Sequence, residues 1–179
     1  MSTLNLPEVW LRGPLPGILP VLQPVAHALL QSREELREMM KDFPEDLLWE
    51  KPGGVASVGF HLQHLTGVID RLFTYAHGNP LSQQQLAALK SEGTPDSTIT
   101  CADLVSRFSL QIDEAIKRLQ AIPEENLLQH RGVGRAQFPS TVLGLVFHCA
   151  EHTMRHLGQL LVTTRILTAT QSNAFTSGS

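Results

Sequence analysis

Four long segments of this chain carry apolar residues at the spacing of an α-helix, and this pattern limits the fold more than any other feature. No stretch alternates convincingly with the period of two that is typical of strands. The sequence therefore predicts an all-α protein, a four-helix bundle in which each helix buries one apolar face. The expected helices run from about Pro20 to Asp42, from the N-cap Ser57 to about His77, from after Thr100 to about Gln120, and from near Ser140 to about Leu167.

The second and third helices are joined by a long connection, from Gly78 to Ile99. Ser82 and Gln85 have the spacing of a capping box, which predicts a short helix over 83–90 within this connection. A link of this length permits a crossover between the two long helices.

The length of 179 residues suits a single domain, with a core over about 20–167 and a mobile tail over 168–179. The net charge is −3 and the 14 Lys and Arg are scattered, so nucleic acid is not an expected partner. No stretch approaches the roughly 18 apolar residues of a membrane span. Cys101 and Cys149 are too few for a secreted disulfide framework, although they could form one disulfide, and free thiols suit a reducing cytoplasm.

Three histidines stand four residues apart in the last helical segment, at His148, His152 and His156. Four residues advance a helix by about 400°, so the three share one face, and imidazole nitrogens bind divalent transition metals such as Zn, Ni and Fe. One ion cannot bind all three, because the outer pair lies about 12 Å apart at about 1.5 Å per residue. A third ligand must come from another helix, and the second helix offers His61 and His64.

Two segments of the sequence, SVGFHLQHLTGVIDRLFTYAHG and HCAEHTMRHLGQL, resemble the signature helices of the DinB-like (YfiT-like) family of metalloenzymes. The resemblance extends over about 20–167. In that family, one histidine of the second helix and an HxxxH pair of the fourth bind a divalent metal. The resemblance implies that the ligands here are His64, which precedes Asp70 and Arg71, and the pair His152 and His156, which precedes Gly-Gln.

Two further histidines, His61 and His148, lie one turn before assigned ligands and depart from the minimal family pattern. On the helical wheel, His61 lies about 60° from the centre of the apolar face and His64 about 120°. Burial therefore favours His61 as the core residue, whereas the motif favours His64 as the ligand. We expect His61, His148 and Gln159 to support the ligands or contact substrate; His148 could equally be a core histidine, and Gln159 a solvated residue.

The resemblance implies a divalent-metal-dependent enzyme, because relatives in the wider superfamily use low-molecular-weight thiols in S-transfer or isomerisation. The expected reaction is thiol-dependent S-transfer or related hydrolytic chemistry on a small molecule, in a cytoplasmic homodimer. Cys149 is expected to be a buried core residue. The alternative is a non-catalytic, metal-stabilised helical bundle that acts as a structural or thiol-sensing stress protein.

Overall fold

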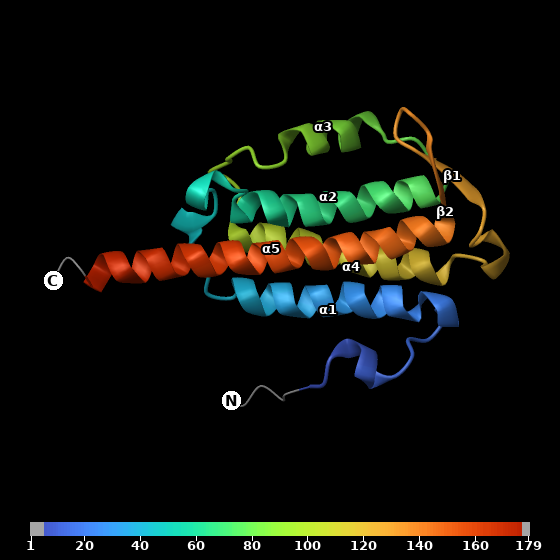
Figure 1. Cartoon of the computed structure of the whole chain (residues 1–179), viewed down its shortest axis with the longest axis horizontal. Helices are drawn as coiled ribbons and strands as arrows, with labels where there is room; N and C mark the ends of the chain where they lie inside the picture. The colour runs from blue at the N-terminus through green and yellow to red at the C-terminus, as the bar shows by residue number, and fades with distance from the viewer. Residues whose placement is uncertain (1–5, 177–179) are drawn as a thin grey trace.

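The structure is a computed structural model that describes residues 6–176, including the side chains up to residue 171, and it is mostly helical (Figure 1). The long helices are α1 (Gln23–Met40), α2 (Val58–Ala76), α4 (Cys101–Gln120) and α5 (Val142–Thr176). The shorter elements are α3 (Gln83–Ser91), two strands, β1 (His130–Val133) and β2 (Phe138–Thr141), and short 3₁₀ turns at Val9–Arg12, Pro20–Leu22, Glu45–Leu47, Pro52–Gly54 and Glu124–Asn126. Within 6–176, no helix is both long and apolar enough to cross a membrane.

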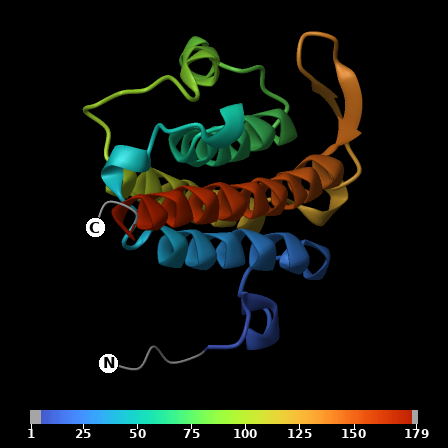
Figure 2. The ribbon, with the colours of Figure 1, turned by 60° about the vertical axis from the view of Figure 1, so that its left-hand side comes forward.

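The long helices pack around one apolar core. α2 contacts α4 and α5, and α1 contacts the same two helices from the opposite side, as Figures 1 and 2 show. Leu29 of α1, Leu65 of α2 and Phe108 of α4 point into the core and are fully buried. α3 lies on the outer side of α2, away from α1 (Figure 2).

The helix starts follow the capping signals in the sequence. The Ser57 hydroxyl accepts the backbone N–H of Phe60, as expected of an N-cap. Ser82 and Gln85 form the predicted capping box at the start of α3, and Thr100 forms another with Asp103 at the start of α4. These bonds satisfy backbone N–H groups that have no partner inside the helix.

The segment HRGVGRAQFPS, between the third and fourth predicted helices, forms an antiparallel hairpin in which His130 pairs with Thr141 and Val133 with Phe138. The prediction that the chain lacks strands was therefore wrong here. Backbone pairing, rather than burial of one face, holds these strands, because every residue in them is exposed or only half-buried. Such a hairpin leaves no alternating apolar pattern to detect.

The last helix is longer than predicted, since α5 continues past Leu167 to Thr176. The segment 168–176 contains neither Gly nor Pro, so nothing in it stops a helix that the core has already nucleated. Gln171 also donates a hydrogen bond of 3.2 Å to the Asp46 carboxylate. The helix therefore occupies most of the predicted mobile tail, and 177–179 lie outside the described residues.

Candidate metal centre

Histidines of α2 and α5 meet where these two helices pack. His64 lies in the second turn of α2, and His152 and His156 lie one turn apart on α5. Ligand-capable nitrogens of these three residues all lie within 4.8 Å of one another. His64 Nε2 is 3.1 Å from His152 Nε2, and the ring centroids of His64 and His156 are 4.4 Å apart. The structure thus brings together the three residues that the motif indicated.

The three imidazoles fit a divalent transition metal. Burial, reinforced by the charge of neighbouring His64, lowers the pKa of His152 and lowers that of His156 to about 4. Both rings are therefore neutral near pH 7, which is the form that binds a metal. The Nδ1 atoms of His152 and His156 are buried without a hydrogen-bond partner among the described residues. Three converging imidazoles are a donor set that suits Zn, Ni or Fe.

A buried carboxylate contacts the His64 ring on its Nδ1 side, opposite the nitrogen that faces His152. His64 Nδ1 lies 2.7 Å from Glu92 Oε2, and Glu92 Oε1 accepts a hydrogen bond of 2.6 Å from Arg71 Nη1. Burial raises the pKa of Glu92, but the bonds from His64 and Arg71 outweigh burial and leave the pKa below its ordinary value. Phe60 stacks on the His64 ring, with centroids 5.3 Å apart. The orientation of His64 is therefore fixed on several sides.

His61 is the buried histidine of α2, with 3 % of its surface exposed, as the apolar wheel predicted. Its ring centroid lies 5.7 Å from that of His156, and its Nδ1 has no hydrogen-bond partner among the described residues. Burial and the nearby His64 lower its pKa to about 4. His61 thus lies beside the three-histidine cluster as a neutral ring.

His148 faces solvent, so its interpretation as a core histidine was wrong. Its side chain is 49 % exposed, and its Nδ1 lies 3.1 Å from the Glu151 carboxylate. The residue lies on the exposed surface of α5, in the turn before His152. His148, Glu151 and His152 form a second group of side chains whose possible ligand atoms lie within 4.8 Å of one another.

Gln159 is exposed and lines a cavity of about 610 Å³ together with His61, Arg155 and Val162. Because His61 also contacts His156, this cavity lies next to the histidine cluster. Cys149 is fully buried, as predicted, and burial raises the pKa of its thiol to about 12. Both cysteines, which lie within the described residues, are free thiols.

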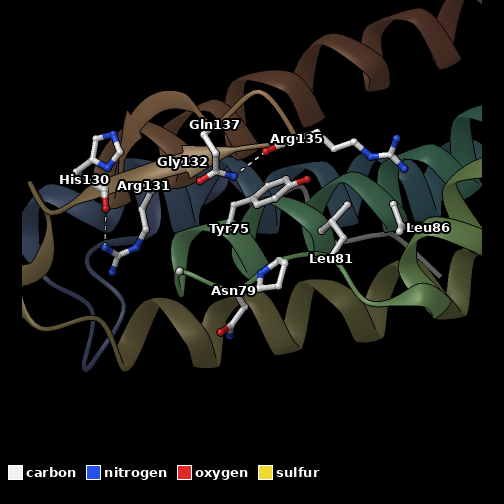
Figure 3. A pocket seen from close by; sticks show the side chains of 12 residues that line it. Tyr75, Asn79, Leu81, Leu86, His130, Arg131, Gly132, Arg135 and Gln137 are labelled. Carbon is white, nitrogen blue, oxygen red and sulfur yellow. Dashed lines mark hydrogen bonds between the residues drawn. The ribbon is translucent and has the colours of Figure 1, made fainter.

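A different cavity, of about 590 Å³, lies at the C-terminal end of α2, between α3 and the hairpin. Figure 3 shows Tyr75 at its centre, with Leu86 on the α3 side and Arg131 and Arg135 on the hairpin. None of its lining residues belongs to the histidine cluster. We therefore locate the candidate site by the converging imidazoles rather than by the size of a cavity.

Comparison with known proteins agrees with this fold. Residues 28–160 match the DinB superfamily, so the chain belongs to that superfamily, as the resemblance indicated. The crystal structure of a conserved protein from Enterococcus faecalis is similar, with a TM-score of 0.64 and 18 % identity over 84 % of this chain and 99 % of that chain. At this identity the likeness shows the fold alone. The comparison with curated proteins found no match.

The sequence revealed only some of the residues that surround His64. Asp70 and Arg71 belong to the motif, and the structure gives each a contact: Asp70 accepts a hydrogen bond from Gln85 of α3, and Arg71 pairs with Glu92. The motif was thus a signal for Arg71. Glu92 follows α3 in an irregular connection, where no periodicity or motif marks it.

Proposed function

We propose that this chain is a four-helix-bundle metalloenzyme in which His64, His152 and His156 bind one divalent transition metal, namely Zn, Ni or Fe. The observation that carries this proposal is the convergence of three imidazole nitrogens from two helices within 4.8 Å. Three protein ligands leave a coordination position open, which is typical of catalytic rather than structural sites. When bound, the metal ion would act as a Lewis acid and favour the deprotonated form of a metal-bound water or thiol at neutral pH.

The proposed reaction is S-transfer from a low-molecular-weight thiol, or related hydrolysis, on a small molecule. The chain's own thiol at Cys149 does not suit the nucleophile's role, because it is fully buried and its pKa is about 12. The thiol would therefore come from a substrate. The cavity of about 610 Å³ beside His61 gives room for the other substrate, with Arg155 and Gln159 as polar groups on its wall.

A cytoplasmic homodimer completes this proposal. Two free cysteine thiols suit a reducing compartment. The exposed apolar side chains of α5, at Phe147, Val162 and Ile166, are surface that a second copy could cover.

The alternative is a metal-stabilised bundle without catalysis, with a structural or thiol-sensing role. The observation that favours it is His61, whose buried Nδ1 lacks a partner among the described residues and whose ring is 5.7 Å from that of His156. If His61 became a fourth ligand, it would close the coordination sphere. An exchangeable water on the metal supports the enzyme, whereas four protein nitrogens support the structural role.

Metal analysis tests the site. Protein purified without added metal should hold close to one divalent ion per chain, and His152→Ala or His156→Ala should abolish this binding. His27→Ala is the matched control, since it removes a histidine of α1 that belongs to neither group of candidate ligand atoms and should leave the metal content unchanged. Unchanged metal in both ligand variants would refute the assignment. Screening low-molecular-weight thiols against electrophilic substrates then tests the reaction.

A further inference from the structure

The turn after α3 places a buried carboxylate directly behind His64. The side chain of Glu92 is 7 % exposed, and its carboxylate lies between the His64 ring and the Arg71 guanidinium, at 2.7 Å and 2.6 Å respectively. An ionised carboxylate can only accept hydrogen bonds, so His64 Nδ1 carries the proton. When the ring is neutral, its lone pair is then on Nε2, the atom that faces His152.

The position of Glu92 depends on a glycine of α2. A Cβ atom at Gly67 would lie 2.6 Å from Glu92 Oε1 and 2.5 Å from Arg71 Nη1, so any larger residue would displace the pair. The next residue of the turn, Gly93, donates its backbone N–H to Gln63 Oε1 at 2.7 Å. Its φ of +78° is in the left-handed region that favours glycine. The turn is thus built onto the face of α2 that carries His64.

The helix before the turn is fastened to α2 as well. Gln85 of α3 donates hydrogen bonds of 2.7 Å to the Asp70 carboxylate and to the Thr74 hydroxyl. Contacts on both sides of Glu92 therefore hold its carboxylate in place against α2.

We propose that Glu92 is a positioning residue for the metal, and that the α3 segment sets the affinity of the site through it. This inference rests on the proposed function, since it takes His64 as a ligand. A carboxylate that accepts the distal N–H of a metal-binding histidine fixes its tautomer and ring orientation and makes the ligating nitrogen more basic. Loss of such a partner typically weakens metal binding about 10- to 100-fold.

The test is the zinc affinity of the full-length protein, measured by competition with a chromophoric chelator. Glu92→Ala should bind zinc about 10- to 100-fold more weakly than the wild type. Glu92→Gln should lose less, because its amide oxygen can still accept the His64 N–H. With cobalt as the probe, the visible absorption bands should shift in Glu92→Ala, a change that a purely structural role would not cause.

Glu34→Ala is the matched control, because Glu34 also pairs with an arginine, Arg12, on the surface away from the site. It should bind zinc as the wild type does. Zinc affinity of Glu92→Ala within about twofold of the wild type would overturn the inference while leaving the three-histidine site intact.

If Glu92→Ala does not fold, Gly67→Ala decides the question, since its added methyl group displaces the carboxylate without removing it. An affinity about tenfold weaker supports the inference, and one within twofold of the wild type overturns it. A wild-type protein that binds none of zinc, nickel and iron would overturn both the proposed function and this inference.

Discussion

His61 combines burial with a titratable ring, and this makes the stability of the metal-free protein depend on pH. Burial and the nearby His64 lower its folded-state pKa to about 4, whereas the pKa of an unfolded histidine is about 6.5. Between these two pH values the unfolded chain binds more protons than the folded chain. The contribution of His61 to the free energy of unfolding is therefore fully present above about pH 6.5 and is lost as the pH falls towards about 4. The loss per such histidine is at most about 1.4 kcal/mol per pH unit.

Urea unfolding of chelator-treated protein between pH 7.5 and 4.5 measures this dependence. His61→Leu removes the titrating ring, so its free energy of unfolding should fall less steeply with acid than that of the wild type. Some dependence should remain, because the pKa values of His152 and His156 are also lowered. Equal slopes in the wild type and the variant would show that His61 is not held neutral.

At the scale of single helices, Gly59 of α2 and Gly158 of α5 look alike in the sequence, but their surroundings differ. A Cβ atom at Gly59, near the start of α2, would overlap the ring of Trp49, whereas nothing lies within 4 Å of the same position at Gly158 on α5. Gly59→Ala should therefore destabilise the protein by about 1–3 kcal/mol through overpacking. Gly158→Ala should stabilise it by about 0.5–1 kcal/mol, since alanine favours helix.

Denaturant unfolding of the two variants beside the wild type checks this pair. The backbone N–H of Gly59 also donates to the Leu48 carbonyl at 2.7 Å, which holds α2 close to the segment that carries Trp49. A Gly59→Ala protein as stable as the wild type would mean that Trp49 does not pack against this turn.

Elements with a strong local signal were predictable. The start of α2 at Ser57 and the capping box of α3 follow from residues a few positions apart. The hairpin was not predictable, because its strands are short and bury no continuous face. The end of α5 was missed because the polar composition after Leu167 resembles a tail, although no helix-breaking residue stands there.

At the scale of the whole molecule, a bound metal should join α2 to α5 and stabilise the folded protein. A ligand that binds only the folded state adds about 2.7 kcal/mol at a free concentration of 100 times its Kd. We therefore expect a chelator to lower the Tm of the wild type and to leave that of His156→Ala unchanged. Differential scanning calorimetry measures both, and an equal fall in the two proteins would place the stabilising ion elsewhere.

The sequence by itself determined the helices and the pair His152 and His156, because both depend on contacts one helical turn apart along the chain. Only the tertiary structure decided that His64 is the histidine of α2 whose nitrogen lies within 4.8 Å of those of both His152 and His156, and that Glu92 lies behind His64. Those relations join residues far apart in sequence, and they depend on how α2 is rotated against α5 and on where the α3 connection packs. No periodicity along the chain encodes such a rotation.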